Sequence, residues 1–146
     1  MGYVPEPVPT GRTTWQYVKA RPEGGLVYPG AIKLRGISWS THQAGTPSAT
    51  YGGVFRTDDS PAQIYEWYGR WLQDHGWVLY RDCPRGGATV WLSDRHYRRG
   101  DQEVFTIAID RPQRLGQVLG VAIPDEGTIF ESTYSIYLPG RGIPSS

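Results

Sequence analysis

The residues whose side chains could act as metal ligands or nucleophiles are few and widely spaced in this chain. His42, His75 and His96 are the three histidines, and none stands beside a second ligand at the spacing that zinc sites use. Cys83 is the only cysteine, and a nucleophilic thiol needs a neighbouring base that the sequence does not point to. We therefore expect no metal site, no internal disulfide and no catalytic cysteine.

A second group of polar residues, Asp58-Asp59-Ser60, could suggest an acid pair beside a hydroxyl. Adjacent carboxylates do not flank a substrate, whereas at a helix start they complement the helix dipole, and a serine there can cap free amides. The glycine pairs at 24–25, 52–53 and 86–87 are not followed by the Gly-Lys-Ser/Thr of a phosphate loop. The sequence accordingly predicts no catalytic residue, no cofactor and a protein that is not an enzyme.

The most distinctive polar stretch is Arg95–Asp101, which we interpret as part of a hairpin tip over residues 95–102. Its arginines could contact phosphates, but interleaved acidic residues leave little net charge, so we do not expect nucleic acid as a partner. A solvated hairpin or a contact with another protein fits better. Together with the N-terminus and a long connection at 111–127, the candidate protein-contact residues are Tyr3, Trp15, Tyr17, Arg95, Tyr97, Arg98, Arg99 and Leu119.

One long helix, within residues 58–77, is the element around which these segments must be arranged. Ser60 is a candidate N-cap, Pro61 suits the first helical position, and Gln63 completes a capping box. Gly76 fits the left-handed residue that ends a helix. The apolar stripe expected at helical spacing consists of Ile64, Trp67, Tyr68, Trp71, Leu72 and His75.

Strand-like stretches precede and follow this helix, and the clearest are 31–40, 51–57, 103–110 and 128–138. An aromatic stripe needs a broad apolar partner, which one face of a sheet supplies. The predicted fold class is α+β: a single antiparallel sheet of about five strands in ββαβββ order, with the amphipathic helix packed on one face and an extended N-terminal arm.

Residues 1–30 form the predicted arm, because their prolines and glycines exclude a long helix or a central strand. The arm is too apolar for a solvated tail, so we expect it to dock on its own domain or on another protein subunit. The remaining predicted divisions are one domain at 31–138 and a C-terminal tail at 139–146.

The length and net charge of the chain limit the classes of function that it can have. The length of 146 residues predicts one domain. The formal net charge of +1 predicts no strong electrostatic field that would attract acidic or basic partners. The N-terminus lacks the pattern of a signal peptide or a lipobox, and no run is apolar enough to span a membrane. The expected location is therefore the cytoplasm or a virion.

The order of several motifs resembles that of small uncharacterised actinobacterial α+β domains. The matching stretches are Tyr28–Ala31, Tyr51–Phe55, Thr57–Pro61, Tyr65–Tyr68 and Leu72–Trp77, within a resemblance that spans residues 26–138. In that family a Tyr-Pro-Gly-Ala turn precedes strands, and a Thr-Asp-Asp-Ser-Pro cap starts a helix that ends in His-Gly-Trp. The resemblance implies the fold and leaves the activity open. Many such domains resemble outer parts of lipoproteins, whereas this chain shows no lipobox cysteine or anchor.

Two classes of function stay open from the sequence. The first is a non-enzymatic interaction or assembly protein, such as a structural subunit of a virion or another multi-protein particle, that contacts other protein subunits through its N-terminal arm. The alternative is a small-ligand-binding module, with its site between the helix and the sheet or beneath residues 111–127, or an envelope-associated accessory domain.

Overall fold

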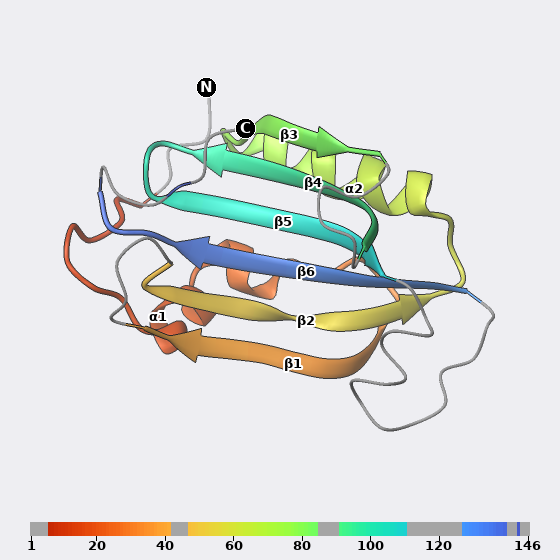
Figure 1. Cartoon of the computed structure of the whole chain (residues 1–146), viewed down its shortest axis with the longest axis horizontal. Helices are drawn as coiled ribbons and strands as arrows, with labels where there is room; N and C mark the ends of the chain where they lie inside the picture. The colour runs from red at the N-terminus through yellow and green to blue at the C-terminus, as the bar shows by residue number, and fades with distance from the viewer. Residues whose placement is uncertain (1–5, 42–46, 85–90, 111–126, 140–142, 144–146) are drawn as a thin grey trace.

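The chain folds as an α+β protein whose main element is one open antiparallel sheet (Figure 1). The computed structural model describes residues 6–41, 47–84, 91–110, 127–139 and 143. The helices within these ranges are α1 (Trp15–Ala20), the 3-10 turn η1 (Pro22–Gly25) and α2 (Pro61–Asp74). The strands are β1 (Ile32–Ser40), β2 (Ala49–Thr57), β3 (Val78–Cys83), β4 (Trp91–Arg99), β5 (Glu103–Asp110) and β6 (Thr128–Ile136). The α+β class is confirmed, but the sheet has six strands rather than the five predicted.

The strands lie in the order β1-β2-β6-β5-β4-β3, and every neighbouring pair is antiparallel. α1 and α2 both lie on the far face of the sheet in Figure 1. Their buried side chains join one core cluster with the inward residues of the central strands, among them Phe105, Phe130 and Tyr134. The N-terminal segment and α2 therefore share one face of the sheet, where they enclose the core.

The boundaries of α2 follow the predicted signals. The Ser60 hydroxyl accepts from the Gln63 amide at 3.2 Å, and the Gln63 side chain accepts from the Ser60 amide at 2.9 Å, which completes the capping box. At the other end, Gly76 has φ of 86° and donates its amide to the Gln73 carbonyl at 3.3 Å, and the Trp77 amide donates to the Leu72 carbonyl at 3.0 Å. These are the backbone bonds of a Schellman ending, so the predicted helix start and stop are confirmed.

The buried face of α2 differs in part from the predicted stripe. Ile64, Tyr68 and Leu72 are fully buried, as expected. Tyr65 and Gly69 are also buried, whereas Trp67 and Trp71 are only half-buried. The contact face is therefore rotated slightly toward β4, where the Tyr97 hydroxyl lies so close to Gly69 that a Cβ there would sit 2.8 Å from it.

The predicted hairpin tip at 95–102 is wrong, because β4 continues through Arg99 and the turn begins at Gly100. Arg95 and Arg99 lie on the helix-covered face, where each guanidinium stacks on a ring, at 4.4 Å from the Tyr65 centroid and 4.6 Å from the Trp77 centroid. A flat guanidinium group can occupy a core-facing strand position in this way when it stacks on an aromatic ring and pairs with a carboxylate.

The N-terminal segment is not extended throughout, since it contains α1 and η1. Thr14 caps α1 by accepting from the Tyr17 amide at 3.3 Å, and Val18 is fully buried against the sheet. Tyr28 is fixed to α2 by its amide, which donates to the Tyr68 hydroxyl at 3.0 Å. Residues 13–28 therefore contribute to the chain's own core.

Candidate functional site

A cluster of four buried charged residues lies where the N-terminal segment meets the β4–β5 hairpin. Arg21 and Glu23 come from the start of η1, and Arg99 and Glu103 come from the ends of β4 and β5. The exposed fractions of the four residues lie between 2% and 8%. Because a buried charge is stable only when it is paired and hydrogen-bonded, the arrangement of these four side chains determines whether this region can fold.

Arg99 is the centre of the cluster. Its Nε and Nη2 atoms donate to the two oxygens of Glu103, at 3.0 Å and 2.8 Å, which forms a bidentate pair. Its Nη1 atom lies 2.9 Å from Glu23 Oε2 and also donates to the His75 carbonyl at 3.1 Å. One guanidinium thus links the N-terminal segment, the hairpin and the end of α2.

Tyr134 of β6 closes the other side of the cluster. Its hydroxyl donates to Glu103 Oε2 and accepts from Arg21 Nε at 2.8 Å. Burial, and next the adjacent Glu103 carboxylate, raise the pKa of Tyr134 well above its ordinary value. The phenol therefore stays protonated and serves as a fixed donor to Glu103.

Glu23 is the one member of the cluster with an unused polar atom. Its Oε2 atom receives Arg99 and the Trp77 indole N–H, the latter at 3.2 Å. Its Oε1 atom is buried and has no hydrogen-bond partner among the described residues. Such an atom is rare in a native protein, since leaving a buried acceptor unpaired destabilises the fold by about 1–3 kcal/mol.

A cavity of about 230 Å³ adjoins this residue. Its lining residues include the apolar Leu26, Phe55 and Phe105 and the charged Lys19, Glu23 and Lys33. The sides come from α1, η1, β1, β2, β5 and β6, so the cavity lies between the N-terminal segment and the sheet. An apolar cavity of about 150 Å³ is large enough to bind benzene in another protein, so this one can hold a small organic molecule.

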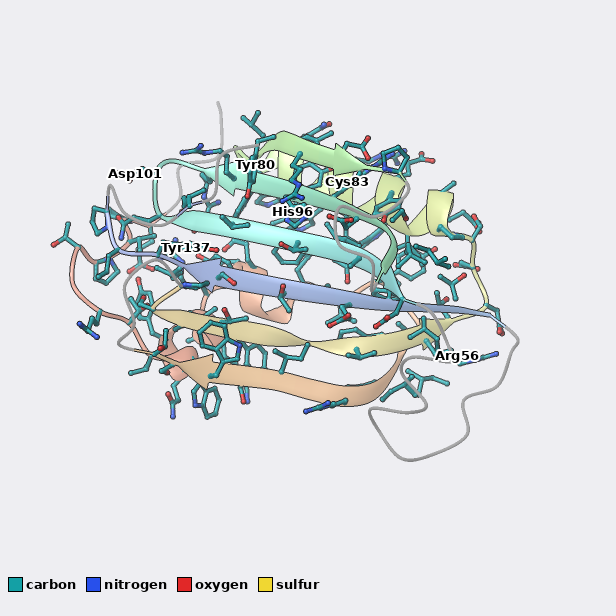
Figure 2. All side chains as sticks on the ribbon, in the orientation of Figure 1. Arg56, Tyr80, Cys83, His96, Asp101 and Tyr137 are labelled. Carbon is teal, nitrogen blue, oxygen red and sulfur yellow. The ribbon has the colours of Figure 1, made fainter. Side chains whose placement is uncertain are left out.

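A separate polar group lies on the opposite face of the sheet, where Figure 2 labels Tyr80 and His96. His96 bonds through Nε2 to Asp94 Oδ2 at 2.6 Å and through Nδ1 to Thr106 Oγ1 at 3.1 Å. The order carboxylate–imidazole–hydroxyl is that of a hydrolase triad. Thr106, however, is in the middle of β5, where its neighbours' amides belong to the strand ladder and supply no oxyanion hole. We therefore interpret Asp94, His96 and Thr106 as a hydrogen-bond network between neighbouring strands.

The predicted contact residues from the N-terminal segment lie against the sheet. Trp15 is half-buried, with its ring stacked on Tyr51 at a centroid distance of 6.1 Å. The Tyr17 hydroxyl accepts from Arg21 Nη1 at 3.0 Å. Tyr3 lies outside the described residues.

The predicted contact residues of 95–102 belong to one strand and face both sides of the sheet. Tyr97 and Arg99 are buried and have internal partners, whereas Arg95 and Arg98 are half-buried. Arg98 bonds to the Gly100 carbonyl at 3.1 Å. Leu119 lies outside the described residues, as does the connection at 111–126. Protein contact through these residues stays a prediction.

The structure brings together Arg99 from the predicted set and four residues that the sequence did not single out: Arg21, Glu23, Glu103 and Tyr134. A sequence signal existed for Glu103, because it shares the parity of Phe105, Ile107 and Ile109 and therefore had to face the core. No comparable pattern marks Arg21 or Glu23.

Comparison with family models, with curated proteins and with solved structures found no match for this chain. Among the described residues, no three His, Cys, Asp or Glu side chains gather as a metal site would require. None of the helices in the same ranges has the length and apolar character of a membrane span.

Proposed function

We propose that this protein binds a small molecule in the cavity between η1 and the sheet. The observation that carries the proposal is the cavity of about 230 Å³ itself, whose lining joins the apolar side chains of Leu26, Phe55 and Phe105 to a few polar residues, among them Lys19 and Lys33. Small-molecule sites commonly combine apolar walls with a few fixed polar groups. Here Arg99 and Trp77 hold the side chain of Glu23, one of the lining residues, in a fixed position before any ligand arrives.

A purely structural role for the buried charges is the competing explanation. It accounts for Arg21, Arg99, Glu103 and Tyr134, whose polar atoms are engaged within the cluster. It also accounts for the charge of Glu23, because Arg21 and Arg99 are balanced by Glu23 and Glu103. It does not account for the cavity beside these residues.

Filling the cavity should abolish ligand binding. Val27 lines the cavity and is half-buried, so Val27→Trp should place an indole in the space that a ligand would occupy. Compounds from a small-molecule library that raise the Tm of the unchanged protein should lose that effect on this variant, because only ligands of the folded state shift the equilibrium. The measurement is a thermal-shift titration.

The matched control is Val78→Trp, because Val78 is 63% exposed on β3, away from the cavity. This variant should keep the full ligand-induced rise in Tm. Compounds that stabilise Val27→Trp as strongly as the unchanged protein would place binding elsewhere and contradict the proposal. A cooperative unfolding transition of Val27→Trp without ligand verifies that this variant is folded.

Assembly with other protein subunits is the second candidate function, and β1 is the observation that favours it. β1 is an edge strand of the sheet, and Ile32 and Trp39 on it are 60% and 39% exposed. An edge with exposed apolar side chains can accept a strand from a partner. A subunit of a multi-protein particle could contact its neighbour through this edge while its own N-terminal segment stays packed on the sheet.

Charged residues on this edge should prevent such pairing. If β1 mediates assembly, Ile32→Lys with Trp39→Lys should convert any oligomer to monomer in light scattering coupled to gel filtration. The control pair Gln73→Lys and Asp74→Lys alters the exposed end of α2 and should leave the oligomer intact. A mass that is the same in all three proteins would count against the β1 edge as an interface.

A further inference from the structure

Building on the second candidate function, assembly through the β1 edge, we propose that β1 pairs with the β3 edge of a second copy of this chain. The sheet then continues from one copy into the next. β1 and β3 lie at opposite edges of the sheet (Figure 1), and among the described residues neither has a strand on its outer side. The backbone N–H and C=O groups along such edges can pair with a strand from another chain.

The exposed apolar side chains gather at these two edges. Among the described residues, the large hydrophobic side chains exposed to solvent are Ile32, Trp39, Val78, Leu79 and Leu92. The first two belong to β1 and the next two to β3, and Leu92 lies on β4 just before the stretch that pairs with β3. Because burial of apolar surface is favourable, a contact that covers both edges at once is stabilised.

Each edge strand also carries one bulge. The bulge in β1 leaves Leu34 opposite no residue of β2, and the bulge in β3 leaves Tyr80 opposite no residue of β4. Side chains along a regular strand alternate between the two faces of the sheet, and a bulge interrupts this alternation. A regular strand therefore cannot match the faces of either edge along its whole length.

The two bulges coincide in one antiparallel register of β1 against β3. The opposed pairs, with the β1 residue first, are Ile32 with Cys83, Lys33 with Asp82, Leu34 with Arg81, Arg35 with Tyr80, Gly36 with Leu79, and Ile37 with Val78. Two residues lie between Lys33 and Gly36, and two lie between Leu79 and Asp82. Neither strand therefore has an extra residue relative to the other, and opposed side chains face the same side of the sheet.

On the helix-covered side, this register opposes a lysine and a carboxylate. Lys33 points to this side, with its Nζ atom 5.8 Å from the centroid of the Tyr51 ring, and it forms no salt bridge among the described residues. Asp82 points to the same side, 3.4 Å from Arg95, and its side chain is 44% exposed. Opposite charges placed across neighbouring strands stabilise the pairing. A second β1 strand in place of β3 supplies no carboxylate, because both charged residues of β1 are basic.

On the other side of the sheet, the register opposes two apolar residues. Ile37 packs there in a small cluster with residues of β2 and β6. Val78 faces the same side, because its partner in β4 is Arg98, which points away from the core. Pairing of the two edges therefore covers the exposed Val78 with the side chain of Ile37.

Protection against pairing is the competing explanation, because bulges and basic residues on edge strands also keep proteins from aggregating. It accounts for each edge by itself. It does not account for the match between the edges, in which the bulges fall at opposed positions and Asp82 opposes Lys33. Features that exclude a regular strand but fit each other make the contact specific for a second copy. Because β1 and β3 are different surfaces, the contact is head-to-tail and leaves one edge of each kind free for further copies.

The single cysteine of the chain makes the register testable. Ile32→Cys places a thiol opposite Cys83 of the second copy, and the Cα atoms of opposed residues in antiparallel strands are about 4.5–5.5 Å apart, within the range of a disulfide. Oxidation of the two thiols by diamide should link this variant into a ladder of dimers, trimers and larger species in a non-reducing gel. The matched control Trp39→Cys, on the same strand but away from Cys83, should form such species at least about tenfold more slowly, because its thiol meets Cys83 only by collision.

Variants with one blocked edge test the head-to-tail arrangement. Ile32→Lys with Trp39→Lys blocks β1, and Val78→Lys with Leu79→Lys blocks β3. Each double variant alone should be a monomer in light scattering coupled to gel filtration, at a concentration where the unchanged protein is oligomeric. An equal mixture of the two should give a dimer, because each variant keeps the edge that the other lacks.

A charge reversal tests the pair of Lys33 with Asp82. Lys33→Asp should weaken association at least about tenfold, because two carboxylates then oppose each other. Addition of Asp82→Lys to the same chain should restore association, since the pair is then present with its charges exchanged. A loss that the second substitution does not reverse would overturn the register.

The outcomes distinguish this inference from the second candidate function. Loss of association in the β1-blocked variant but not in the β3-blocked variant would overturn this inference and leave β1 as an assembly edge. Equal rates of ladder formation in Ile32→Cys and Trp39→Cys would overturn the register. An unchanged protein that is monomeric at its highest soluble concentration, together with no ladder from Ile32→Cys, would overturn both. The cavity site is tested separately and stands in each case.

Discussion

Replacing Arg99 by leucine is expected to lower the free energy of unfolding by about 3–5 kcal/mol, the range for removal of one partner from a buried ion pair. The substitution leaves Glu23 and Glu103 without their shared guanidinium. It also removes the donor to the His75 carbonyl at the end of α2. Urea unfolding followed by tryptophan fluorescence measures the loss.

The neighbouring arginine provides the matched control. Arg98 points to the other face of β4, is half-buried and bonds only to the Gly100 carbonyl and the Tyr80 ring among the described residues. Arg98→Leu should change stability by no more than about 0.5 kcal/mol, as surface substitutions usually do. Equal losses at the two positions would show that the buried cluster contributes no special stability.

A double-mutant cycle tests whether Arg99 acts through Glu103. Glu103→Gln keeps the shape of the side chain and removes its charge, so Arg99 loses one of its two anionic partners. Because the two residues form a bidentate pair, the double variant should be less destabilised than the sum of the single variants, by about 0.5–3 kcal/mol. Strict additivity would contradict direct coupling.

The parts of the fold that the sequence predicted correctly depend on local interactions. The start and end of α2 are determined within the helix, by Ser60, Gln63 and Gly76, so their geometry could be predicted without knowledge of any partner. The antiparallel sheet followed from alternating apolar residues, as in Phe105, Ile107 and Ile109 of β5.

The parts that the sequence did not predict depend on distant partners. The end of β4 was predicted to be a solvated tip because it contains Arg95 and Arg99. Their guanidinium groups lie over the rings of Tyr65 and Trp77, which are distant in the sequence. Glu23 follows Pro22 in a segment rich in proline and glycine, and its partners Trp77 and Arg99 are 54 and 76 positions away along the chain. The candidate cavity could not be predicted from the sequence either, because its lining residues come from six elements that meet only in the folded protein.

Removal of residues 1–30 is expected to prevent the remaining chain from folding. The deleted segment includes Val18, Leu26 and Tyr28, and burying side chains of this size contributes about 1.5–3 kcal/mol each. Deletion also removes Arg21 and Glu23 from the buried cluster. The combined loss is as large as the whole stability of a typical domain, about 5–15 kcal/mol. The circular dichroism spectrum of the truncated protein should therefore be that of an unfolded chain, and its NMR spectrum should show little chemical-shift dispersion.

A point substitution tests the same conclusion in the full-length chain. Val18→Asp places a carboxylate at a fully buried position of α1, whereas Gln16→Asp adds the same group at an exposed position of the same helix. Val18→Asp should lower the Tm sharply or abolish the transition, and Gln16→Asp should leave it within a few degrees. If residues 1–30 were instead a detachable docking arm, both variants and the truncated chain would unfold like the unchanged protein. In that case binding to a partner subunit, rather than the stability of the isolated chain, would depend on Val18.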